Sequence, residues 1–190
     1  MAAVESTMLP LGHEAPAFSL PDPAGTVHAL ESGHAVSVVM FICNHCPFVK
    51  HVADELAAIG EDYAGKDVRI YAINSNDIAA YPADGPDAMR EEAARRGYGF
   101  PYLLDEDQSV AKAYRAACTP DFFVFDGQLN LAYRGQLDGS RPSNGVPVTG
   151  ADLRAAIDAL LAGDSPPAEQ SPSIGCNIKW KPGNEPEYFG

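Results

Sequence analysis

The sequence has few basic residues and no long apolar run. It carries 13 Lys and Arg against 26 Asp and Glu, a formal net charge of −13. Nucleic acids and anionic membrane surfaces attract basic proteins, so this balance argues against both as partners. No apolar run reaches the roughly 18 residues that a transmembrane helix needs. The opening segment, MAAVESTMLPLGHEAP, also lacks the basic and apolar stretches of a secretory signal, so we expect a cytoplasmic protein.

Cysteine is scarce too, with only Cys43, Cys46, Cys118 and Cys176. Static disulfides are rare in the cytoplasm, so we expect these thiols to be catalytic, metal-binding or simply buried. Cys43 and Cys46 form a C-x-x-C motif, but no second paired motif accompanies it, as zinc sites usually require. The sequence therefore favours a redox dithiol without bound metal or cofactor. A metal site that adds Cys118, Cys176 or His51, and a pair of inert buried thiols, remain alternatives.

The order of expected elements indicates an α/β sandwich. The apolar run at 35–42 predicts a central strand buried on both faces. A helix follows it, because apolar residues recur there at three- and four-residue spacing, namely Val49, Val52, Leu56 and Ile59. We expect further elements as a strand at 67–76, helices at 87–97 and 108–117, a hairpin at 121–135 and a helix at 150–163. Early strand–helix alternation with a late hairpin is typical of three layers around a mixed sheet.

The last part of the chain changes in composition. Residues 164–173 are rich in Pro and Ser, like a linker, whereas the segment after them holds the single Trp and several other apolar side chains. Burying such side chains is favourable, by about 1.5–3 kcal/mol each. We therefore expect one domain at 1–163 and an ordered tail at 164–190 that packs on it.

Cys43 is expected where the buried strand ends and the next helix begins. Unpaired N–H groups and the helix dipole favour a thiolate there, so its pKa should fall. His45, when protonated, would add positive charge and tune this pKa further. This makes Cys43 the expected nucleophile and Cys46, one turn further on, the resolving thiol. Pro47 is compatible with the first helical turn, which needs no N–H donors.

Several segments resemble the thioredoxin-fold superfamily over residues 9–163. The similar stretches are GHEAPAFSLPDPAGTVHAL, FPYLLDEDQSVAKAY and CTPDFFVFDGQLNLAYRGQLD. More narrowly, CNHCPFVKH, NSND, YRGQLD and GCNIKWKPGNEPEYF resemble the peroxiredoxin-like group, which is related to alkyl hydroperoxide reductase and thiol-specific antioxidant proteins. The resemblance implies a thioredoxin-like fold with an N-terminal strand extension. It also implies a thiol–disulfide oxidoreductase that acts on a protein or small-molecule thiol or disulfide, with a thioredoxin or glutathione system as electron donor.

The same resemblance assigns the surroundings of the dithiol. Thr119 and Pro120 resemble the cis-proline loop that faces the dithiol, where the backbone before the proline pairs with an extended substrate. Cys118 would then lie near Cys43, either as a third exchanging thiol or as a small packed residue. Cys176 could reach the active site or pair with Cys118.

A thiol peroxidase is the second hypothesis. Peroxiredoxins carry their peroxide-reducing cysteine in the motif P-x-x-x-(T/S)-x-x-C, and Cys46 with the following Pro47 fits the end of that motif. Cys43 then replaces the hydroxyl residue and Val39 replaces the proline, so we rank this activity below dithiol exchange. A non-enzymatic redox-sensing or metal-binding module is the third hypothesis.

The sequence leaves the catalytic base open. Ser37 stands where thioredoxin has a buried Asp, so His51 or a loop carboxylate would have to act instead. Asn74, Asn76 and Asp77 close the second strand, and they either line a substrate groove or form a turn.

Overall fold

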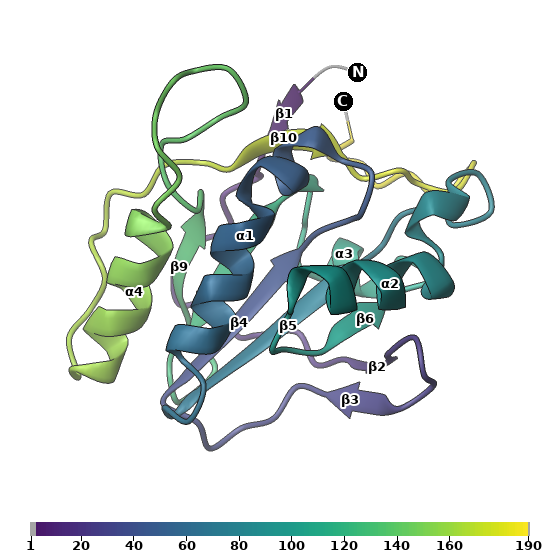
Figure 1. Ribbon diagram of the computed structural model, residues 1–190. Coiled ribbons are helices and arrows are strands. Elements are labelled where there is room, and N and C mark those ends of the chain that lie inside the picture. Colours follow the sequence, from purple (N-terminus) through teal and green to yellow (C-terminus); the bar gives the residue numbers. More distant parts are fainter. Residues whose placement is uncertain (1–2, 190) are drawn as a thin grey trace.

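A five-stranded sheet with the order β6-β5-β4-β8-β9 forms the middle layer of the computed structural model, which describes residues 3–189 (Figure 1). Its strands are β4 (Val36–Phe41), β5 (Val68–Asn74), β6 (Tyr102–Leu104), β8 (Asp121–Phe125) and β9 (Leu131–Gly135). β4 is parallel to β5 and antiparallel to β8, so the sheet is mixed. Every residue of β4 is buried, as its continuous apolar sequence predicts for a central strand.

Helices and an N-terminal segment cover the two faces of this sheet (Figure 1). On one face lie α1 (Pro47–Asp62), α2 (Pro86–Arg96) and α4 (Ala151–Leu161), whose buried side chains share one apolar cluster. The other face is covered by α3 (Ser109–Ala113) and by the segment that leads into the hairpin of β2 (Ser19–Pro21) and β3 (Val27–Ala29). A 3-10 turn, η1 (Pro82–Asp84), precedes α2. The predicted three-layer α/β class is confirmed.

The two ends of the described chain meet in a second, small sheet. Its order is β1-β10-β7, with β1 (Ala3–Glu5), β10 (Ile174–Asn177) and β7 (Cys118–Thr119), all antiparallel. β10 crosses near the start of α1 (Figure 1). Beyond it, Ile178 and Trp180 are buried in the apolar cluster on the α3 face. The sequence predicted an ordered tail, but it did not predict β7 or that the tail would form a strand beside it.

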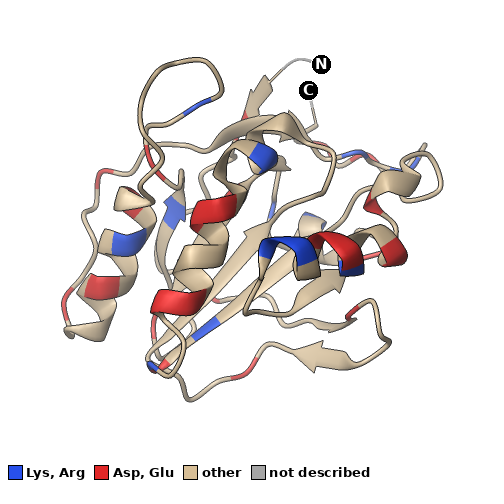
Figure 2. Ribbon diagram, in the orientation of Figure 1, with Lys and Arg blue, Asp and Glu red and all other residues tan. Residues whose placement is uncertain are grey.

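Charged side chains are spread over the helices (Figure 2). α2 carries both signs, and Arg96 on it pairs with Asp54 on α1 and with Glu92 one turn back. An ion pair open to solvent, such as the one to Asp54, adds little stability, so the apolar layers hold the fold together. Within residues 3–189, no helix has both the length and the apolar character needed to cross a membrane.

We propose that residues 1–163 and the tail unfold as one unit. Trp180 is 8% exposed and its ring lies 6.4 Å from that of Tyr188. Trp180→Ala should lower the free energy of unfolding by about 3 kcal/mol, because it removes a buried aromatic side chain. Phe189→Ala is the matched control, since Phe189 is 45% exposed and should cost less than about 0.5 kcal/mol. Urea denaturation followed by fluorescence and by circular dichroism would measure both. Two separate transitions in the wild type would contradict a single unit.

Candidate active site

Both cysteines of the C-x-x-C motif lie in the loop between β4 and α1. Helix α1 begins at Pro47, and Cys46 is its N-cap residue, with φ −65° and ψ 124°. Cys43 therefore lies between the strand end and the helix start, as expected, but three residues before the N-cap, so Cys46 is not one helical turn further on. Pro47 explains the difference, because proline favours the first helical position and its fixed φ starts the helix there. The N-terminal end of the helix dipole acts on Cys46 more directly than on Cys43.

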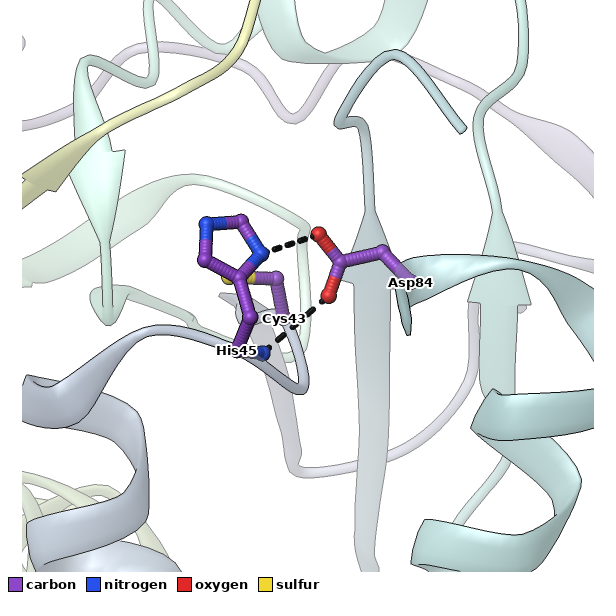
Figure 3. A group of neighbouring side chains, drawn as sticks. All are labelled: Cys43, His45 and Asp84. Carbon is purple, nitrogen blue, oxygen red and sulfur yellow. Dashed lines mark hydrogen bonds and ion pairs between the residues drawn. The ribbon is translucent and has the colours of Figure 1, made fainter. Parts of the chain in front are cut away.

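A buried carboxylate, Asp84, holds this loop in place. One of its oxygens, Oδ1, accepts hydrogen bonds from the backbone N–H groups of Asn44 at 2.9 Å and His45 at 3.2 Å. The other, Oδ2, accepts from His45 Nδ1 at 2.5 Å and from Asn76 Nδ2 at 2.8 Å. Asp84 is fully buried, and four N–H donors compensate the cost of burying its charge. Figure 3 shows the carboxylate facing the His45 ring and the loop backbone.

His45 lies beside Cys43, and two neighbours hold its ring in place. Its Nδ1 is bound to Asp84, and its ring stacks on Tyr81 at 5.2 Å with 9° between the planes. Its Nε2 is buried and has no hydrogen-bond partner among the described residues. The nearest sulfur, nitrogen and oxygen atoms of Cys43, His45 and Asp84 all lie within 4.8 Å of one another. When Nδ1 carries the proton that Asp84 accepts, Nε2 has a lone pair that can take up a further proton.

The same three residues have the donor types of a metal site, since they offer a thiol, an imidazole and a carboxylate. However, the Asp84 oxygens already accept four hydrogen bonds from nitrogen donors. Binding a cation would displace several of these bonds. We therefore interpret Asp84 as the residue that orients His45.

Cys43 and Cys46 are both buried, at 1% and 0% exposure. The hydrogen bond with Cys46, together with burial and the nearby Asp84 charge, raises the pKa of Cys43 well above its ordinary value. The same thiol–thiol bond, aided by contacts to Cys176 and Thr119, outweighs burial and lowers the pKa of Cys46. The expected fall of the Cys43 pKa is therefore not found. Deprotonating Cys43 requires a base, and His45 lies beside it.

Thr119 contacts both cysteines of the dithiol. Its hydroxyl oxygen lies 3.5 Å from Cys43 Sγ, and its carbonyl accepts a bond from the protonated Cys46 Sγ at 3.2 Å. The Thr119–Pro120 peptide bond is cis. The expectation was that this backbone pairs with an extended substrate. In the structure, β10 of the same chain pairs with it, with Cys176 opposite Thr119.

The two remaining cysteines have different surroundings. Cys176 is buried in the same apolar cluster as Cys43 and Cys46. Cys118 is buried outside that cluster, and its Sγ donates to the carbonyl of Pro120 at 3.5 Å. Burial, with a contribution from Asp121, raises the pKa of Cys118 well above its ordinary value. Neighbouring strand residues point to opposite faces, and with Thr119 facing the dithiol we interpret Cys118 as the packed residue of the two alternatives.

The sequence left the base open between His51 and a loop carboxylate; the loop carboxylate, Asp84, binds His45, and His45 is the residue beside Cys43. His51 Nε2 instead bonds to Ser140 Oγ at 2.7 Å. Sequence reasoning did not single out Asp84, although it lies in a Pro-flanked loop soon after a strand end, a common place for site residues in α/β folds. Asn74 and Asp77 bond to neighbouring backbone N–H groups, as turn residues do. The side-chain amide of Asn76 donates a hydrogen bond to Asp84 and so links Asp84 to this turn.

The fold and the dithiol loop together define a thioredoxin-like protein. The chain matches the AhpC/TSA family over residues 11–134, and it belongs to that family. It is 59% identical to an uncharacterized conserved protein from Geobacillus kaustophilus, with a TM-score of 0.94 over 96% of this chain and 98% of that one. A hypothetical protein from Sinorhizobium meliloti 1021 is 50% identical, with a TM-score of 0.93 over 94% of this chain and 99% of that one.

More distant structures share the fold alone. The thioredoxin domain of a thiol-disulfide oxidoreductase from Bacteroides vulgatus is 16% identical, with a TM-score of 0.57 over 70% of this chain and 90% of that one. A comparison with curated proteins gives no match. The family and the thioredoxin-like neighbours support a redox function.

The geometry predicts that His45 is the base and His51 is not. His45→Ala should slow the reaction of Cys43 with a small disulfide at neutral pH by roughly tenfold or more, because general bases contribute at least that much. The rate should recover as the pH rises and the thiolate forms without help. His51→Ala is the matched control and should stay within about twofold of the wild type. Quenched-flow mass spectrometry of the Cys43 peptide across pH would measure both. Equal losses in the two variants would contradict this assignment.

Proposed function

We propose that the protein is a thiol–disulfide oxidoreductase whose redox centre is the Cys43–Cys46 dithiol. The observation that carries the proposal is the pairing of two interacting thiols, one beside a histidine–carboxylate pair and one at a helix N-cap. Thiol–disulfide exchange needs a sulfur that can be deprotonated on demand and a second sulfur within reach of the first. This loop supplies both.

In the proposed reaction, Cys43 attacks the disulfide of a substrate. His45 takes the proton of Cys43, and Asp84 stabilises the resulting imidazolium. A bond forms between Cys43 and one substrate sulfur, and the other substrate sulfur leaves as a thiolate. Cys46, as a thiolate, then attacks Cys43 Sγ and releases the second substrate sulfur as a thiolate. The substrate disulfide is reduced and the Cys43–Cys46 disulfide forms. We expect a thioredoxin or glutathione system to return the two electrons.

Single-cysteine variants test this order of attack. With a small disulfide, Cys46→Ser should accumulate a mixed disulfide on Cys43, because nothing resolves it, whereas Cys43→Ser should lose turnover. The wild type should show a reversible Cys43–Cys46 disulfide, and Cys118→Ser is the matched control that should behave like it. Intact-protein and peptide mass spectrometry after acid quenching would detect these species. A mixed disulfide found only on Cys46 would reverse the proposed roles. A wild-type protein that never forms the Cys43–Cys46 disulfide would overturn the proposal.

A thiol peroxidase is the second candidate, and one observation favours it. Cys46 occupies the N-cap of α1 and has a lowered pKa, and it also fits the position of the peroxide-reducing cysteine in the family motif. A thiolate at this position would attack a peroxide oxygen, release water or an alcohol, and become a sulfenic acid. Against it, Cys43 stands where the motif has a hydroxyl residue.

Hydrogen peroxide separates the two candidates. If the protein is chiefly an exchange enzyme, peroxide turnover with a thiol reductant should be at least tenfold slower than turnover of a small disulfide. A stopped-flow assay at matched concentrations would measure both rates. Fast peroxide consumption that survives Cys43→Ser and disappears in Cys46→Ser would instead establish a peroxidase centred on Cys46.

A further inference from the structure

The tail strand β10 brings a third thiol to the dithiol. In the β10–β7 pair, Cys176 lies directly opposite Thr119, the residue whose carbonyl contacts Cys46. Cys176 is 4% exposed and packs in the same apolar cluster as Cys43 and Cys46. The interaction between the two thiols also contributes to the raised pKa of Cys176 and the lowered pKa of Cys46. Cys46 therefore has two neighbouring thiols, one from its own loop and one from the tail.

The position of β10 is fixed by close packing. A Cβ atom added to Gly175 would lie 2.0 Å from the Thr119 carbonyl oxygen, so only glycine permits this approach. Before the strand, Ser173 Oγ donates to the carbonyl of Gly135 at 3.0 Å. After it, the backbone N–H of Lys179 donates to Asn76 Oδ1 at 2.8 Å. These anchors on both sides of Cys176 hold its sulfur beside Cys46.

We propose that Cys176 is a third redox thiol that exchanges with the Cys43–Cys46 disulfide. The proposal rests on the function proposed above, which supplies that disulfide. The thiolate of Cys176 attacks Cys46 Sγ, a Cys46–Cys176 bond forms and the Cys43–Cys46 bond breaks. Cys43 leaves as a thiolate and gains the proton that Cys176 has lost. The exchange therefore moves a disulfide within the protein and needs no further oxidant or reductant.

In the reduced protein, the raised pKa of Cys176 opposes this exchange. Burial, followed by the interaction with Cys46, raises the pKa of Cys176, whereas the nearby Lys179 lowers it. Once Cys46 is part of a disulfide, its thiolate is gone and so is its contribution to that rise. Cys176 thus becomes easier to deprotonate after the dithiol has been oxidised. The product covalently joins β10 to the start of α1, while it frees Cys43.

Disulfide mapping in the wild type and three variants tests the proposal. The protein is oxidised with glutathione disulfide, quenched in acid, alkylated and digested for mass spectrometry. The wild type should yield both Cys43–Cys46 and Cys46–Cys176 linked peptides. Cys43→Ser should increase the Cys46–Cys176 peptide at least fivefold, because Cys46 then has one partner left. Cys176→Ser should yield only the Cys43–Cys46 peptide. Cys118→Ser, the matched thiol control, should reproduce the wild-type pattern.

A glycine pair tests the role of β10 without altering any sulfur. Gly175→Ala should reduce the Cys46–Cys176 peptide at least fivefold, because the added methyl group forces the strand away from Thr119. Gly139→Ala is the matched control, since no atom lies within 4 Å of its added Cβ. If Gly175→Ala does not fold, the cysteine variants still decide the matter.

The outcomes separate this proposal from the function on which it rests. A Cys43–Cys46 disulfide with Cys176 always alkylated, even in Cys43→Ser, overturns the third thiol and leaves the oxidoreductase intact. The absence of any Cys43–Cys46 disulfide overturns the proposed function instead. A link from Cys46 to Cys118 rather than to Cys176 would also overturn the role of β10.

Discussion

The geometry of the dithiol loop depends on one buried carboxylate. Asp84 accepts hydrogen bonds from two successive backbone N–H groups of the dithiol loop, from the His45 ring and from Asn76. A loop that links a strand to a helix cannot satisfy these donors within itself, and leaving them buried without acceptors would cost about 1–3 kcal/mol each. The same carboxylate that shapes the loop also binds Nδ1 of His45, and Nε2 has no partner among the described residues. The shape of the loop and the orientation of His45 therefore depend on one residue.

The site is assembled from parts that lie far apart in the chain. The dithiol follows β4, Asp84 lies in η1, and Thr119 lies before β8. Asn76 links them to the tail, because its side chain donates to Asp84 and accepts from the backbone N–H of Lys179. These contacts join segments that are distant in the sequence, so the geometry around the dithiol is a property of the whole fold. It also means that β10 and the dithiol loop are coupled through one amide side chain.

Local patterns in the sequence predicted the layers well and the site only in part. The apolar run of β4 and the spacing of Val49, Val52 and Leu56 are local signals, and the strand and helix formed where they indicated. Pro47 lies in the first turn of α1, as its missing N–H allows, but the sequence did not show that both cysteines precede the helix. Asp84 and β10 could not be found in this way, because their roles arise from contacts with distant segments. No periodicity in the sequence shows which loop carboxylate will meet which histidine.

The place of β10 in the chain has a consequence for biosynthesis. This strand follows every other described element, so it emerges from the ribosome after the sheet and its helices. Domains begin to fold while synthesis continues, and for that interval the dithiol loop has no covering strand. Until β10 is in place, Thr119 lacks its strand partner and the dithiol lacks the neighbouring Cys176 thiol. Oxidative damage to this protein should consequently depend on how fast it is translated, and not only on how much of it the cell contains.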